Sequence, residues 1–245
     1  MFRSSSLYRR ALPFVSSTVI AAGILTSVTS GVVAQESATP TAMGLVQTAE
    51  DLPECPVAEI GALPEGVDAA TVYAIVPEES TARYRVMEEL AQVGENEAVG
   101  ETQAIVGQFG FGDDGLPVPC SRFDVDLRTL QSDQAKRDNY LYKNTLEAEK
   151  YPLATFVLRA VEGLDAPMEE GKETTLRLIG DLTLRDVTKL VAWEAKVTLA
   201  EGVLTGTAAT VFEMSDFGIE PPSVPVVLSL DETIRLEVDL TARPV

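Results

Sequence analysis

The stretch Arg122-Phe-Asp-Val-Asp-Leu-Arg-Thr129 alternates apolar and charged residues with a period of two. Phe123, Val125 and Leu127 fall on one face of an extended chain, and the charged residues between them fall on the other. This alternation is typical of a β-strand with one buried face and one face open to water.

The same alternation recurs along most of the chain. Near the C-terminus, residues 234–240 repeat it, with aliphatic residues on one face and charged residues on the other. Short turn sequences rich in Gly, Asp and Glu separate such segments. The pattern predicts about eight strands, near residues 81–88, 100–111, 122–129, 154–162, 173–185, 189–200, 203–214 and 234–240. Strands of this kind bury their apolar faces by closing on themselves, so we expect an all-β, eight-stranded antiparallel barrel.

One helix interrupts the strands. It is expected to begin near Ser132-Asp133, where either side chain would cap it, and to run to about Glu147. Tyr151-Pro152 is then expected to end the helical segment and begin the next strand. The fold prediction is therefore a barrel with one short helix.

Residues 1–34 have the pattern of an export signal. Arg9-Arg10 end a basic stretch, an apolar run follows to Val33, and a small residue, Ala34, precedes the expected cleavage point. The alternative is an uncleaved anchor. Residues 35–70 contain four prolines and no sustained apolar period, so they are predicted to form an extended linker to a barrel domain at 71–245. We expect a periplasmic, cell-envelope or secreted protein with no transmembrane segment after processing.

Charge and the missing histidine restrict the function. The net charge of −19 repels phosphate backbones, so nucleic acid is not an expected partner. The absence of histidine removes the commonest general base and metal ligand, and no cofactor or metal is expected. Two cysteines, Cys55 and Cys120, are too few for a zinc cage; they either form one disulfide that ties the linker to the barrel or stay as free thiols.

No catalytic constellation is evident. Asp124 and Asp126 share the charged face of their strand, which is expected to be open to water, and the acidic pair Glu88-Glu89 is interpreted in the same way as solvated charge. No nucleophile stands beside a base. The sequence therefore indicates a protein that is not an enzyme.

A set of short motifs occurs in order from about residue 72 to 243. These are Pro77-Glu78-Glu79-Ser80, Tyr84-Arg85-Val86, Val106-Gly107-Gln108-Phe109, Asp126-Leu127, Ser132-Asp133, Arg137-Asp138, Tyr151-Pro152, Thr155-Phe156, Gly180-Asp181-Leu182-Thr183-Leu184 and Met214-Ser215-Asp216-Phe217-Gly218-Ile219. In these motifs the chain resembles the YceI-like family of periplasmic and secreted proteins. The resemblance implies a lipocalin-like antiparallel barrel associated with the binding of polyisoprenoid lipids.

The expected inward positions suggest where a ligand would lie. Arg137, near the start of the helix, is a candidate for binding a polar headgroup; the alternative is an ion pair that pins the helix to the barrel. The predicted ligand-binding residues are Phe109, Phe111, Phe123, Val125, Arg137, Phe156, Leu158, Trp193, Phe212 and Phe217.

Two functions remain open at this point. The first is non-catalytic binding of an isoprenoid-type lipid, such as a polyisoprenoid or quinone, or of another apolar molecule. The alternative is a structural or surface-interaction module whose barrel is packed solid by its own side chains. An apolar cavity in the barrel distinguishes the two. The sequence names neither the ligand nor the oligomeric state.

Overall fold

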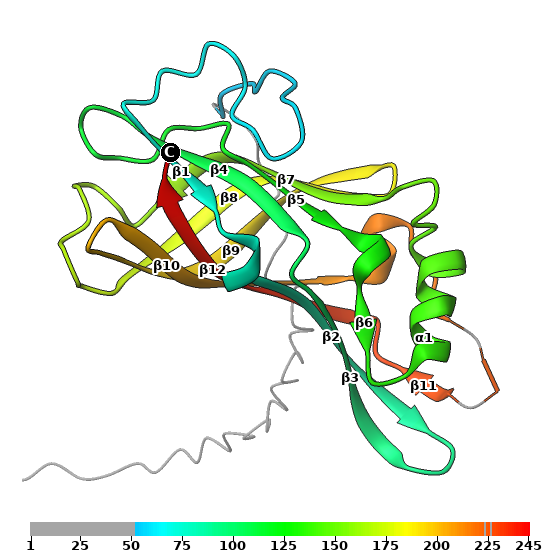
Figure 1. The fold of residues 1–245 in the computed structure, drawn as a ribbon. Coiled ribbons are helices and arrows are strands. Elements are labelled where there is room, and N and C mark those ends of the chain that lie inside the picture. Colours follow the sequence, from blue (N-terminus) through cyan, green and yellow to red (C-terminus); the bar gives the residue numbers. More distant parts are fainter. Residues whose placement is uncertain (1–51, 223, 226) are drawn as a thin grey trace, which may run out of the picture. The chain divides into compact units, whose positions relative to one another are not determined.

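The structure is a computed structural model that describes residues 52–222, 224–225 and 227–245, so the predicted export signal and residues 35–51 lie outside the described residues. The described chain forms a β-barrel with one short α-helix (Figure 1). Its strands are β1 (Thr71–Ile75), β2 (Thr81–Leu90), β3 (Gly94–Thr102), β4 (Ile105–Phe111), β5 (Arg122–Asp126), β6 (Gln131–Ser132), β7 (Leu153–Glu162), β8 (Thr174–Leu184), β9 (Val187–Ala200), β10 (Val203–Glu213), β11 (Val227–Leu230) and β12 (Thr233–Pro244).

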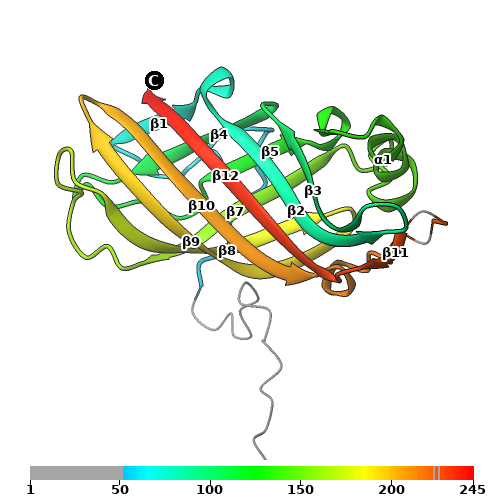
Figure 2. The same ribbon diagram turned by 90° about the horizontal axis from the view of Figure 1, so that it is seen from below.

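Eight strands close into a ring. Their order is β1-β4-β5-β7-β8-β9-β10-β12, and β12 pairs back with β1, where Tyr73 lies opposite Pro244. Neighbouring strands of the ring are antiparallel, and Figure 2 shows them crossing the barrel at a common tilt. The prediction of a closed, eight-stranded antiparallel barrel with one short helix is confirmed.

The remaining strands extend one end of the barrel. A 3-10 turn at Pro77–Glu79 separates β1 from β2, and β12 pairs with β1 through its C-terminal residues and with β2 through residues 235–239. β2 pairs with β3, and β3 pairs with the two-residue β6. α1 (Ala135–Tyr140) and a π-helical turn (Leu141–Thr145) then lead from β6 to β7. β6 and β7 do not pair with each other, so this helical segment connects them at this end of the barrel.

Details of the helix differ from the prediction. The N-cap is Gln134 and makes no side-chain cap hydrogen bond, so the predicted cap at Ser132 or Asp133 is wrong. The Ser132 hydroxyl instead accepts from the Gln134 amide at 3.2 Å and donates to the Asp138 carboxylate at 2.5 Å. The helical turns end at Thr145, and Glu147 has a left-handed φ of 48°, which stops the helix earlier than expected. In the described chain, no helix has the length and apolarity needed to cross a membrane.

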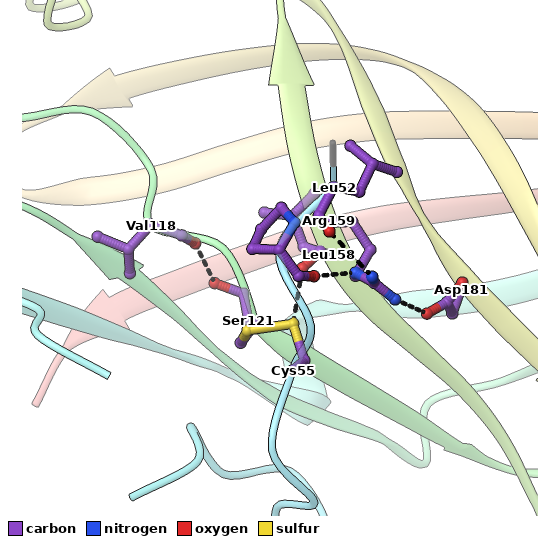
Figure 3. Close-up of a disulfide and its surroundings, with 9 residues drawn as sticks. Leu52, Cys55, Val118, Ser121, Leu158, Arg159 and Asp181 are labelled. Carbon is purple, nitrogen blue, oxygen red and sulfur yellow. Dashed lines mark hydrogen bonds and ion pairs between the residues drawn. A yellow bond between two sulfur atoms is a disulfide. The ribbon is translucent and has the colours of Figure 1, made fainter. Parts of the chain in front are cut away.

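Residues 52–70, the described part of the predicted linker, contain no helix or strand and are attached to the barrel. A disulfide joins Cys55 to Cys120, with 5.3 Å between their Cα atoms. Beside it, the guanidinium of Arg159 on β7 donates to the backbone carbonyls of Leu52 and Pro53 and pairs with Asp181 (Figure 3). The linker is thus held at its first described residues by both a covalent and a polar attachment.

A second attachment centres on Asp124 of β5. Its carboxylate accepts two hydrogen bonds from Arg122 at 2.8 and 2.9 Å, one from the Thr155 hydroxyl at 2.7 Å and one from the Gly61 amide at 2.7 Å. Arg122 in turn donates to the Ala58 carbonyl at 2.6 Å. The side chain of Asp124 is completely buried, so the expectation that it faces open water is wrong, because residues 58–61 cover this part of the outer wall.

Candidate functional site

An apolar cavity of about 980 Å³ occupies the inside of the barrel. Its lining comes from strands β2 to β5, β7 to β10 and β12, and nearly all of the contributing side chains are apolar. At one end the cavity reaches Pro117, Leu164 and Met168 in the loops after β4 and β7. At the other it reaches α1, β11 and the β2–β3 turn, which lie together in Figure 1. The cavity therefore follows the length of the barrel.

Small side chains keep this space open. The cavity-lining positions include five alanines on five different strands: Ala82, Ala98, Ala154, Ala195 and Ala208. On β9, the inward series runs through Val191, Trp193 and Ala195, and Ala195 is only 2% exposed. Protein interiors are normally packed to the density of organic crystals, so alanines at these positions leave an unusually large space unfilled.

Nine of the ten predicted ligand-binding residues line the cavity. They are Phe109, Phe111, Phe123, Val125, Arg137, Phe156, Leu158, Trp193 and Phe212. Ring centroids are 4.4 Å apart for Phe109 and Phe123, 6.0 Å for Phe123 and Phe156, and 6.0 Å for Phe156 and Trp193. The wall between β4 and β9 thus carries a row of aromatic rings, which suits contact with an unsaturated or planar apolar molecule.

Phe217 is the predicted residue that the structure does not place on the cavity. It ends a 3-10 helix (Met214–Phe217), is 1% exposed, and packs its ring 4.6 Å from that of Phe212. Gly218 follows with a left-handed φ of 63°, a conformation that suits glycine. Phe217 therefore packs against Phe212, which lines the cavity, without lining the cavity itself.

Arg137 lines the cavity at its α1 end, and its guanidinium donates to two carboxylates and, at 3.4 Å, to the Ser132 hydroxyl. The distances are 2.6 Å to Glu88 and 2.7 Å to Asp133. Glu88 is 7% exposed and also accepts a hydrogen bond from Asn96 at 2.8 Å. The interpretation of Glu88 as solvated charge is wrong. Alternation along β2 places Tyr84, Val86 and Glu88 on the inward face. This alternation could have assigned Glu88 to the interior, but two adjacent acidic residues, Glu88 and Glu89, resemble a solvated surface.

Tyr84 is a second cavity residue that the sequence analysis missed. Its ring lies against Gly100 of β3, where a Cβ atom would come within 2.3 Å of the ring. The hydroxyl is buried without a hydrogen-bond partner among the described residues. Burial raises the pKa of Tyr84 to about 12, and the nearby carboxylates act in the same direction while Arg137 opposes them. The phenol is therefore a neutral hydrogen-bond donor at physiological pH.

The raised pKa of Tyr84 predicts a loss of stability at high pH. The unfolded phenol ionises near pH 10 but the folded one near pH 12, so the free energy of unfolding should fall as the pH rises from about 10 to about 12. Urea denaturation between pH 9 and 11.5 measures this decline. Tyr84→Phe should show a shallower decline, since it removes the titrating group; equal declines in the two proteins would contradict the assignment.

The described chain is a closed antiparallel β-barrel around an apolar cavity, which is a binding fold. A family model for the YceI-like domain matches residues 73–242. The chain belongs to the YceI-like family.

Known proteins similar to this chain agree with that membership. Two UPF0312 proteins of Pseudomonas putida, from strains W619 and GB-1, are each 33% identical to it over 132 residues, which is 50% of this chain and 65% of theirs. The matched region thus spans just under two thirds of the length of these relatives.

Two solved structures share the fold. A polyisoprenoid binding domain from Saccharophagus degradans, implicated in plant cell wall breakdown, superposes with a TM-score of 0.57 at 13% identity, covering 70% of this chain and 97% of that one. BcnA of Burkholderia cenocepacia superposes with a TM-score of 0.54 at 15% identity, covering 68% and 98%.

Proposed function

We propose that this protein binds a polyisoprenoid-type lipid, or another long apolar molecule, inside its barrel without chemically changing it. The observation that carries the proposal is the apolar cavity of about 980 Å³. Ligand pockets commonly measure roughly 300 to 1,000 Å³, so this cavity has room for a lipid chain rather than for a few waters. Each methylene that enters contributes about 0.8 kcal/mol and requires no polar partner.

The rival function, a solidly packed barrel that acts only through its surface, has less support. A filled barrel would place large side chains at inward positions that here hold alanine, including Ala98 and Ala195. An empty apolar void lacks the dispersion contacts that its lining atoms would otherwise make, so it lowers stability unless a guest fills it. The described interior is better explained as a binding site.

We also propose that binding takes place outside the cytoplasm. The disulfide between Cys55 and Cys120 suits an oxidising compartment, and the pattern of residues 1–34 suits export. An intact mass of the protein from its own host tests this, since removal of the signal should leave Gln35 as the first residue. A chain of full mass with reduced cysteines would contradict the proposal.

The direct test of the function is native mass spectrometry of the protein purified from its own host, followed by solvent extraction. We expect one apolar lipid per chain, released on denaturation and identified from its fragments. A protein that carries nothing and takes up no long-chain apolar probe would refute the proposal. Trp193 makes the uptake measurable, because it is the only tryptophan of the chain and lines the cavity.

Ala195→Phe should block the cavity. The new ring would project from the inward face of β9 into the void, so we expect at least about a tenfold loss of affinity for an apolar probe. The melting temperature should stay level or rise, because the ring fills empty space. Fluorescence titration and a thermal melt measure both. Lys196→Phe is the matched control, since the adjacent residue is exposed and faces outward; equal probe binding by both variants would place the probe elsewhere.

A further inference from the structure

Three of the charged residues that line the cavity, Glu88, Lys136 and Arg137, lie at its α1 end. Alternate residues of β2 turn Tyr84, Val86 and Glu88 inward, while Arg83 lies on the outer face and pairs there with Asp239 at 2.6 Å. α1 adds Arg137 and the exposed Lys136 to the lining. A lipid that fills the apolar length of the barrel would therefore present its polar end to this group.

Arg137 is already neutralised. It donates to the carboxylates of Glu88 and Asp133, and the side chains of Arg137 and Glu88 are only 16% and 5% exposed. An arginine that binds a phosphate needs its donors free, because the phosphate oxygens take the place of a carboxylate. In this structure a phosphate could approach Arg137 only by lying beside these carboxylates or by displacing one of them, the buried Glu88 or the exposed Asp133.

The remaining charge at this end is negative. Three carboxylates, Glu88, Asp133 and Asp138, lie near two cations, Arg137 and Lys136. The Asp138 carboxylate accepts hydrogen bonds from the Ser132 amide and hydroxyl. A phosphate or diphosphate that enters would lose hydration, and Lys136 is the one cation among the described lining residues that has no carboxylate partner. Lys136 is exposed to solvent, and the acidic groups outnumber it.

A neutral oxygen finds a better partner. The Tyr84 hydroxyl lines the same end, has no hydrogen-bond partner among the described residues, and keeps its proton at physiological pH because its pKa is about 12. A buried donor of this kind is usually satisfied by another group, and a carbonyl or hydroxyl of the ligand would satisfy it without bringing charge.

We propose that the α1 end of the cavity selects an uncharged headgroup, such as a quinone, phenol or alcohol, over a phosphorylated one, and that Glu88 is the residue that sets this preference. The proposal rests on the proposed function, since it concerns the headgroup of the lipid that the barrel would hold. Glu88 acts by occupying Arg137 and by adding its own negative charge to the site.

The test compares two probes of equal chain length, geranylgeraniol and geranylgeranyl diphosphate, on the purified protein by Trp193 fluorescence. We expect the unaltered protein to bind the alcohol at least about tenfold more tightly. In Glu88→Gln, which keeps the shape of the side chain and its capacity to accept from Asn96, affinity for the diphosphate should rise about tenfold while affinity for the alcohol stays level.

Glu89→Gln is the matched control. It removes the same charge from the next residue of β2, which is exposed on the outer face, and should leave the ratio of the two affinities unchanged. If the unaltered protein binds both probes equally, or prefers the diphosphate, the inference is refuted while lipid binding stands. If neither probe binds, the proposed function itself fails. A rise in diphosphate affinity equally large in both variants would also overturn the role of Glu88.

Discussion

Asp124→Ala is expected to lower the free energy of unfolding by about 3 to 5 kcal/mol, because it leaves a largely buried arginine without its carboxylate. The guanidinium of Arg122 is 15% exposed and would lose both of its hydrogen bonds to Asp124. The Thr155 hydroxyl and the Gly61 amide would lose their acceptor as well. Urea denaturation of the purified protein measures the change.

Asp126→Ala provides the comparison. Asp126 pairs with Arg128 two residues away, as Asp124 pairs with Arg122, but this second pair lies near the surface, with side chains 24% and 53% exposed. Its removal should cost about 1 kcal/mol or less, since solvent screens exposed pairs. Comparable losses in the two variants would show that burial beneath residues 58–61 adds nothing to the stability of the first pair.

Removal of the disulfide by Cys55→Ser together with Cys120→Ser should cost about 2 to 5 kcal/mol. The bridge closes a loop between residues 65 positions apart, so its loss releases a long segment in the unfolded state. In the folded protein, residues 52–57 would keep only their polar attachment to Arg159 and should become sensitive to proteases. Denaturation and limited proteolysis followed by mass mapping test both effects.

Binding of an apolar probe should survive the loss of the disulfide. Neither cysteine lines the cavity, and the ring of strands closes through β1 and β12 without them. Undiminished protection of residues 52–57 in the double variant would show that the polar contacts alone hold this segment.

The barrel could be predicted because its strands carry the information locally. On β5 and β12 every inward residue is apolar and the intervening residues are mostly charged, so a window of seven residues assigns the face. The strands β6 and β11 were missed because each is four residues or shorter and forms mainly through pairing with distant segments. The strand predicted at 100–111 corresponds to two strands, the end of β3 and the whole of β4. Gln103 and Ala104 separate them, because neither residue belongs to a strand.

The polar residues were harder to predict than the aromatic ones. Phe109, Phe123 and Phe156 line the cavity as expected because an aromatic residue on an alternating strand has few other places to lie. Asp124 and Glu88 were assigned to solvent, yet each is buried by a partner far away in the sequence: Gly61 for the first and Arg137 for the second. A single sequence does not encode such pairings in any local pattern.

The pairing of β1 with β12 also governs how the protein can fold. Residues near positions 73 and 244 must meet before the ring is complete, so the closing contacts span nearly the whole barrel domain. Contacts of such long sequence separation slow folding, because the entropy of closing the loop is lost before the contacts form. Until β12 docks, the apolar inward faces of the other strands remain exposed to water and to other chains. We therefore expect slow folding and a need for protection against aggregation during the interval before closure.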